Sequence, residues 1–426
     1  MEKLVSELRT LCRPLQLAVL VVLTSAPVSC GKDWSASRTM ASVRPEGPDP
    51  GEPVQPPPHS GRIPEYYVAG VEYPQDYDWI RDPQYGTVDC TMFLMKDGDR
   101  ILEFGVGYEY SISPDADMAR CIGDHIYTDY STSGETVVKK DGQELFRYPG
   151  REMMAGFIVR DGTGILTLGV PREGHGWTLR KNGAVVSSSD KGYPVSHLYL
   201  DGETAVFGWK IPENDLYGQE ETYCIVRDGI PEAVASGTGD DGQETVDFLQ
   251  HDNVLYILYL DKSGNAYLRA DGEDRDLELP EGASLHSLEG LLSDSLAVYV
   301  FGEIETAAGE LRNVLWKGSR IRQVFDADVA VSACYPDGDR LGATGYLRDD
   351  RTSPVYFLDG EYASLPSGYG FVPENSADFA DGHFCLILMP LETGIPPVYV
   401  IDGKVHILDI NGYLLSIGRL WTESPS

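Results

Sequence analysis

Short runs of alternating apolar and polar residues fill most of this chain, and they recur as one unit at an interval of about 43 residues. Each unit reads as an apolar strand, a tight turn that contains glycine, and a second strand. The turn glycines of the eight units are Gly98, Gly142, Gly183, Gly229, Gly272, Gly318, Gly360 and Gly403. A period of about 40–45 residues in all-β sequence is typical of propeller blades.

A second set of turns runs in phase with the first. Its members follow the first strand of a unit and are Asp161-Gly162, Asp201-Gly202, Asp252-Asn253, Asp337-Gly338 and Asp381-Gly382. Such pairs favour the positive φ angles of type I′ hairpin turns. The clearest unit has strands at residues 287–292, 296–301, 313–316 and 320–324. The pattern therefore predicts an all-β domain over residues 64–421, a single β-propeller of four-stranded antiparallel blades. We expect eight blades, or seven if the first unit is incomplete.

The two ends of the repeat region indicate how the ring closes. The first unit begins with residues 65–73, which read as a second strand with no first strand before them. After the last hairpin a surplus apolar segment, residues 413–421, remains. We expect this C-terminal strand to take the vacant innermost position of the first blade, because pairing the termini removes two exposed strand edges.

The N-terminal residues predict the cellular location of the protein. A basic start and a short apolar run over residues 15–23 are typical of a secretory signal peptide, here residues 1–29. Cys30 then resembles the acylated cysteine of a bacterial lipoprotein, although Pro27 stands where Leu is usual. Residues 30–63 are rich in proline and predict an extended tether, and residues 422–426 a short tail. The alternative is ordinary secretion, with Cys30 incidental.

The hairpins at residues 177–183 and 314–318 carry a Trp, a basic residue and a turn glycine. They resemble the W-K-N-G repeats of uncharacterised β-propeller lipoproteins of Bacteroidetes, and the resemblance extends over residues 64–421. It implies a lipid-anchored protein of the bacterial cell envelope, at the outer membrane or the cell surface. It implies no particular ligand, and the chain lacks the WD dipeptides of WD40 blades and the glycine doublets of kelch repeats.

The charge limits the partners. The net charge is −33, from 34 basic and 67 acidic residues. Such a surface repels phosphate backbones, so nucleic acid is excluded as a partner. We expect contact with a membrane only through the lipid anchor, and a monomeric protein.

No residue pattern of a catalytic or metal site is present. Five of the seven cysteines lie outside the leader and show no CxxC spacing, which favours buried free thiols, with one disulfide left open. The eight histidines form no HxH or HExxH pair, and we expect hydrogen-bonded structural roles for His125 and His383. The sequence therefore indicates no cofactor.

Variable loops on the face opposite the tight turns are the predicted functional region. Aromatic and charged residues there suit stacking on sugar rings and hydrogen bonding to their hydroxyl groups. The candidate ligand-binding residues are Tyr77, Trp79, Arg81, Tyr85, Trp177 and Tyr217. The alternative is that these rings pack against neighbouring loops.

These observations favour a non-catalytic binding or protein-interaction module, with an envelope protein or a glycan as its partner. The alternative is a carbohydrate-active propeller, such as a polysaccharide lyase or a glycoside hydrolase, because propeller enzymes assemble sites from distant blades.

Overall fold

A computed structural model describes residues 62–80, 88–106, 119–122, 124–131, 134–150, 152–160, 164–171, 175–194, 198–201, 204–212, 221–236, 244–294, 296–371, 377–380, 382–392 and 394–423. All of them belong to one compact unit, residues 54–426. Their regular structure is β-strand throughout, and these residues include no helix long and apolar enough to cross a membrane.

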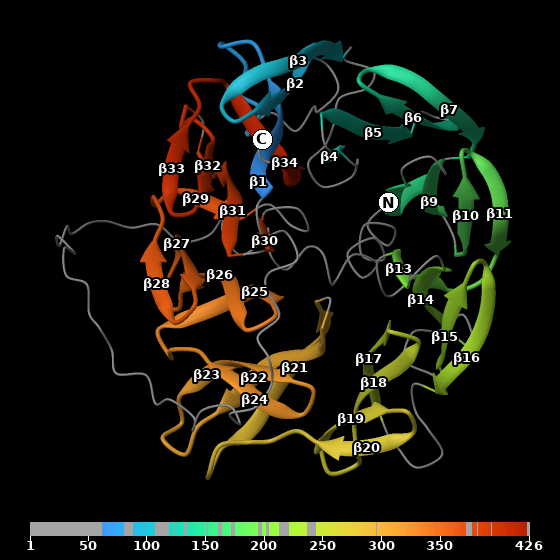
Figure 1. The fold of residues 1–426 in the computed structure, drawn as a ribbon, viewed down its shortest axis with the longest axis vertical. Helices are drawn as coiled ribbons and strands as arrows, with labels where there is room; N and C mark the ends of the chain where they lie inside the picture. Colours follow the sequence, from blue (N-terminus) through green and yellow to red (C-terminus); the bar gives the residue numbers. More distant parts are fainter. Residues whose placement is uncertain are drawn as a thin grey trace, which may run out of the picture. The chain divides into compact units, whose positions relative to one another are not determined.

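The strands form eight antiparallel sheets arranged as the blades of one β-propeller (Figure 1), which confirms the predicted fold. Blade 1, from the innermost strand outward, consists of β34 (Gly412–Glu423), β1 (Arg62–Glu72), β2 (Cys90–Lys96) and β3 (Asp99–Val106). The other blades follow the chain outward in sequence order.

Blade 2 consists of β4 (Ala119–Ile122), β5 (His125–Ser131), β6 (Glu135–Lys140) and β7 (Gln143–Pro149). Blade 3 consists of β8 (Glu152–Arg160), β9 (Gly164–Pro171), β10 (Trp177–Lys181) and β11 (Ala184–Ser189). Blade 4 consists of β12 (Tyr193–Pro194), β13 (Tyr199–Asp201), β14 (Thr204–Pro212), β15 (Glu221–Arg227) and β16 (Ile230–Ser236). Blade 5 consists of β17 (Glu244–His251), β18 (Val254–Leu260), β19 (Ala266–Ala270) and β20 (Glu273–Asp276).

Blade 6 consists of β21 (Ser284–Ser293), β22 (Val298–Glu305), β23 (Leu311–Lys317) and β24 (Arg320–Val324). Blade 7 consists of β25 (Val329–Asp337), β26 (Arg340–Leu347), β27 (Asp350–Leu358) and β28 (Glu361–Ser364). Blade 8 consists of β29 (Tyr369–Phe371), β30 (Ala377–Ala380), β31 (His383–Pro390), β32 (Val398–Ile401) and β33 (Lys404–Ile407). In blades 4 and 8 two short strands share the innermost position.

The ring closes as the sequence predicts. β34 pairs antiparallel with β1, with Tyr413 opposite Val71 and Trp421 opposite Pro64. The first blade is therefore complete, which decides for eight blades over seven. The two strands extend slightly beyond the predicted domain bounds, to Arg62 and Glu423.

In every blade but blade 6, the hairpin between the third and fourth strands contains a residue with positive φ followed by glycine. The φ angle is 49° at Asp97, 52° at Asp141 and 48° at Asp402, as a type I′ turn requires. The side chain of the turn aspartate also accepts a hydrogen bond from the second strand of the same blade. The Ile126 and Phe384 backbone N–H groups each donate to Oδ1 of their turn aspartate at 2.9 Å. The repeated Asp-Gly pair therefore sets the turn and satisfies a strand N–H.

The innermost strands depart from regular pairing at one level of the ring. In blades 6 and 7 an extra residue bulges opposite a glycine of the second strand. A Cβ atom at Gly302 would lie 2.6 Å from the Ser287 carbonyl oxygen, and one at Gly345 would lie 2.3 Å from that of Ala330. Only glycine therefore lets the bulged backbone approach the second strand this closely.

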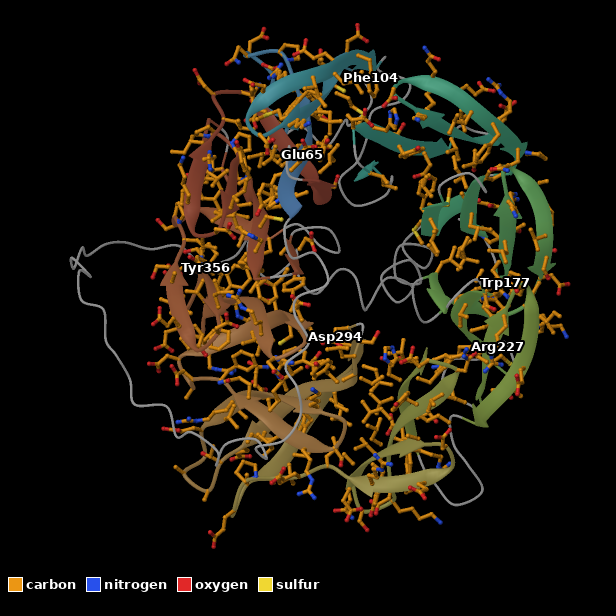
Figure 2. The ribbon with its side chains drawn as sticks, in the orientation of Figure 1. Glu65, Phe104, Trp177, Arg227, Asp294 and Tyr356 are labelled. Carbon is orange, nitrogen blue, oxygen red and sulfur yellow. The ribbon has the colours of Figure 1, made fainter. Side chains whose placement is uncertain are left out.

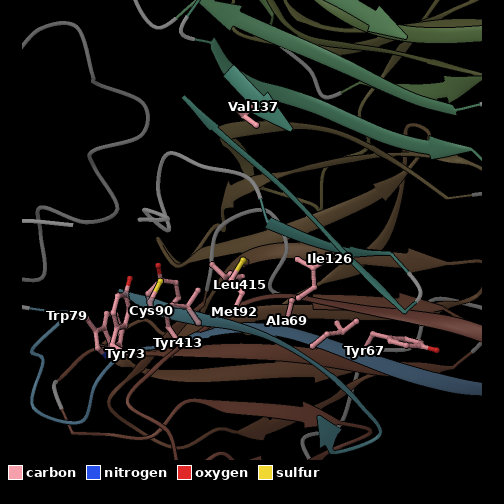
Figure 3. Packing of buried hydrophobic residues seen from close by; sticks show 12 residues of the cluster. Tyr67, Ala69, Tyr73, Trp79, Cys90, Met92, Ile126, Val137, Tyr413 and Leu415 are labelled. Atoms are coloured by element: carbon pink, nitrogen blue, oxygen red, sulfur yellow. The ribbon is translucent and has the colours of Figure 1, made fainter. Parts of the chain in front are cut away.

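The core lies between neighbouring blades and consists of clusters of buried apolar side chains. One cluster joins blades 1 and 2 through β34, β1, β2, β5 and β6 (Figure 3). Four cysteines among the described side chains, Cys90, Cys224, Cys334 and Cys385, are buried and free, as predicted. Burial raises the pKa of the Cys90 thiol to about 11, so this thiol stays protonated and unreactive. The side chain of Cys121 lies outside the described residues.

Candidate functional site

The strand ends divide the propeller into two faces. Within a blade, tight turns join the first strand to the second and the third strand to the fourth, and all of these turns lie on one face. The longer loops between the second and third strands and the links between blades lie on the other face. Of the residues predicted to bind a ligand on this second face, Arg81, Tyr85 and Tyr217 lie outside the described residues, as does Cys30. Their roles remain predictions.

The loop after β1 is part of the ring closure. The Trp79 side chain is buried, and its ring centroid lies 4.8 Å from that of Tyr413 on β34. Asn411 holds the loop in place, because its Nδ2 donates hydrogen bonds to the Pro74 and Tyr77 carbonyl oxygens. Tyr77 is half-buried beside the same cluster, with its ring 5.2 Å from that of Tyr73. These rings therefore stabilise the closure of the ring.

Trp177 begins β10 and lies in the core between blades 3 and 4 (Figure 2). Only 2% of the residue is exposed, and its ring lies 5.0 Å from Phe207 and 5.7 Å from Trp209, edge to face in both cases. The prediction that Trp79 and Trp177 present an exposed stacking face is wrong, because both rings fill space between strands. The sequence of β10 does predict the burial of Trp177, because side chains alternate between the two faces of a strand and Trp177 shares a face with the apolar Leu179.

A buried ion pair that the sequence did not indicate lies within blade 3 and faces blade 2. The Arg180 guanidinium on β10 contacts the Glu152 carboxylate on β8 through two hydrogen bonds of 2.5 and 2.8 Å. Its Cζ also lies 3.7 Å from the ring centroid of Tyr148 on β7. A Cβ atom at Gly169 would lie 1.9 Å from Glu152 Oε2, so glycine there makes room for the pair. The pair and the stacked ring fix two neighbouring blades in register.

A half-buried carboxylate joins blades 5 and 6. Asp247, on the innermost strand β17, accepts hydrogen bonds from the backbone N–H groups of Phe248 and of Leu291 on β21, each at 2.7 Å. Burial raises the pKa of Asp247 to about 6, and the two backbone hydrogen bonds only partly oppose this shift.

The two histidines singled out in the sequence are structural. Nδ1 of His125 lies 2.8 Å from Oδ2 of Asp141, and Nδ1 of His383 lies 2.8 Å from Oδ2 of Asp402. Both histidines therefore reinforce the turn aspartates. Across the described ranges no group of three His, Cys, Asp or Glu side chains could hold a metal ion.

The outer rim of blades 3 and 4 carries an exposed apolar surface. Val185 and Val186 on β11 are 59% and 49% exposed, and Ile230 at the start of β16 is 72% exposed. The Ser187 hydroxyl donates to the Gly229 carbonyl oxygen at 2.7 Å, which joins the two strands. Arg227, at the end of β15 beside this turn, is labelled in Figure 2. We call Val185, Val186 and Ile230 the rim patch.

No protein-family model matches this chain, and no curated protein matches it either.

Several solved structures resemble it. A dihydro-heme d1 dehydrogenase, NirN, is 12% identical with a TM-score of 0.45, over 84% of this chain and 74% of that one. A puromycin-hydrolysing peptidase of Mycobacterium tuberculosis is 13% identical with a TM-score of 0.42, over 72% of this chain and 55% of that one. The β-propeller domain of the Trilobed protease of Pyrococcus furiosus is 12% identical with a TM-score of 0.42, over 69% of this chain and 97% of that one.

Proposed function

We propose that this chain is a non-catalytic protein-interaction module held at the bacterial cell envelope. The observation that supports an interaction role is the rim patch, where three β-branched side chains from two blades are exposed together. Clustered apolar side chains on the surface of a soluble domain mark interaction sites more often than single exposed residues do.

A protein partner is favoured over a glycan by the burial of the two tryptophans. A stacking platform for sugars needs an open aromatic face, and the rings of Trp79 and Trp177 are enclosed by Tyr413 and by Phe207 and Trp209. The rim patch is aliphatic, which suits contact with apolar protein side chains.

The interaction role is tested in cells that produce the full chain with a C-terminal affinity tag. Reversible cross-linking before lysis, followed by purification and mass spectrometry, is expected to recover one envelope protein repeatedly. The purified chain is also incubated with a panel of polysaccharides, and we expect no product. Turnover of any polysaccharide would contradict the non-catalytic proposal and favour a carbohydrate-active propeller.

The envelope location is supported by the leader, by Cys30 and by the proline-rich segment that follows it. We expect Cys30→Ala to move the protein from the membrane fraction to the soluble fraction, because acyl chains supply the anchor. The measurement is fractionation followed by immunoblotting, with Cys90→Ala as a control, since Cys90 is buried in blade 1. Unchanged membrane association of Cys30→Ala would contradict lipidation at this residue.

A further inference from the structure

We infer that the rim patch binds a net-basic protein of the envelope through apolar side-chain contacts. The inference rests on the proposed interaction function and names the surface and the chemistry of the partner.

At the seams between blades 1 and 2, 2 and 3, and 3 and 4, the turn glycine of one blade lies against the outermost strand of the blade before it. A Cβ atom at Gly142 would lie 2.8 Å from the Phe104 ring, one at Gly183 would lie 2.9 Å from the Phe146 ring, and one at Gly229 would lie 2.3 Å from Ser187 Cβ. Two of these contacts are therefore made by an aromatic ring and the third by a hydroxymethyl group. Ser187 is therefore nearest to the turn at Gly229, and Val185, Val186 and Ile230 are exposed on the same rim.

The rim patch can be desolvated without burying an unpaired charge. β11 has the sequence AVVSSS, and it is the one outermost strand of the eight blades that contains no charged residue. The charged side chains that flank Ile230 already have partners, since Arg227 pairs with Glu232 and Asp228 accepts a hydrogen bond from the Ala205 backbone N–H at 2.9 Å. A partner that covers the patch therefore avoids the large penalty of burying an isolated charge.

The pairing of β11 favours contact through side chains over the addition of a strand. Leu179 pairs with Ser187 and Arg180 with Val185, so Val186 is left as a bulge in the outer edge. Bulges in edge strands disturb the hydrogen-bonding groups that an added strand would need. The edge resists strand addition, while the side chains of Val185 and Val186 still present apolar surface.

The charge of the chain decides which kind of protein the patch binds. A net charge of −33 repels a second copy of this chain and attracts a cationic surface. The occupant we infer is therefore a protein with an apolar contact region and an overall positive charge. Its association is expected to be fastest at low salt.

The test places a photo-cross-linking amino acid at position 186 or at position 407 of the full-length protein in the cells that encode it. Ile407 is the matched control, because it is 65% exposed on the outermost strand β33 of blade 8. We expect position 186, and not position 407, to give an adduct with one net-basic protein. With that partner purified, Ile230→Glu is expected to raise the dissociation constant at least tenfold, and Ile407→Glu to leave it within twofold. Raising the salt concentration should weaken wild-type binding.

The outcomes separate the inference from the proposed function. An adduct of this chain with itself, an adduct with a net-acidic protein, or equal yields from positions 186 and 407 would overturn the inference and leave an interaction role in place. The absence of adducts from position 186, from position 407 and from a scan of the remaining rim and loop positions would overturn both.

Discussion

Asp247 links two innermost strands through its carboxylate alone. It accepts backbone hydrogen bonds from Phe248 in its own strand and from Leu291 in the next blade, and burial raises its pKa to about 6. An unfolded aspartate has a pKa of about 3.9. Between these two values the folded protein binds more protons than the unfolded chain. Folding stability from this group therefore decreases as the pH rises from about 4 to about 6, by about 3 kcal/mol, and is constant above that range.

Asp247→Asn removes this titration. As the pH rises from 4 to 7, the unfolding free energy of the variant should therefore decrease by about 3 kcal/mol less than that of the wild type. Urea denaturation at a series of pH values measures the difference. Asp276→Asn, at an exposed position of β20, controls for the general effect of removing one charge from an acidic protein. Parallel pH profiles for wild type and Asp247→Asn would contradict the argument.

Arg180 and Glu152 are a second case of a charged group with a specific partner on another strand, here within blade 3. Removal of one partner leaves the other charge buried without its counterpart, so Arg180→Met should lower the unfolding free energy by about 3–5 kcal/mol. The double variant Glu152→Gln with Arg180→Met should recover at least half of that loss. The matched control is Arg147→Met, because Arg147 pairs with Glu144 and Glu135 on the surface, where solvent screens the pair and its loss costs little stability. Chemical denaturation distinguishes the three variants, and equal losses for Arg180→Met and Arg147→Met would count against a buried role.

At the scale of the hairpin, the turn aspartates provide two separable contributions. Asp402 adopts a φ of 48° and also accepts hydrogen bonds from the Phe384 N–H and from His383. Asp271 adopts nearly the same φ, 52°, but its carboxylate accepts no hydrogen bond from the described residues. Substitution by alanine imposes the same backbone strain at both positions and removes hydrogen bonds at only one.

Asp402→Ala should therefore destabilise the protein by about 1–3 kcal/mol more than Asp271→Ala. Thermal unfolding of both variants measures the difference at the transition midpoint. If the two variants unfold at the same temperature, the strand-binding role of the turn aspartate is wrong and only its turn propensity matters.

At the scale of the whole molecule, β34 makes the ring continuous. It covers the edge of β1 and places Tyr413 against Trp79, in the cluster that joins blades 1 and 2. Without it, β1 becomes an exposed edge strand and this cluster loses one of its largest side chains. Exposed edges of this kind favour pairing with other chains.

A chain that ends at Asn411 should consequently lose its cooperative thermal transition and form aggregates. Differential scanning calorimetry and size-exclusion chromatography test this, and a chain that ends at Glu423 is the control, because it retains all of β34. A monomeric product with a wild-type transition would show that the ring does not depend on closure by the C-terminal strand.

The sequence by itself determined the repeat, the two sets of turns, the four-stranded blades and the closure of the ring. These features depend on local chemistry, since the alternation of apolar residues defines strands and Asp-Gly pairs define hairpins wherever they occur. The structural roles of His125 and His383 could also be predicted, because each is the first residue of a strand beside a turn aspartate.

The tertiary structure alone decided which polar and aromatic side chains from distant parts of the sequence meet. Glu152 meets Arg180 across 28 residues, and Asp247 meets Leu291 across 44. Trp79 meets Tyr413 from the opposite end of the chain, and this contact buries a ring that the sequence analysis placed at a binding surface. Val186 is exposed where the register of β11 shifts against β10. The sequence does not reveal these contacts, because each depends on the distance and direction between side chains of different strands or blades.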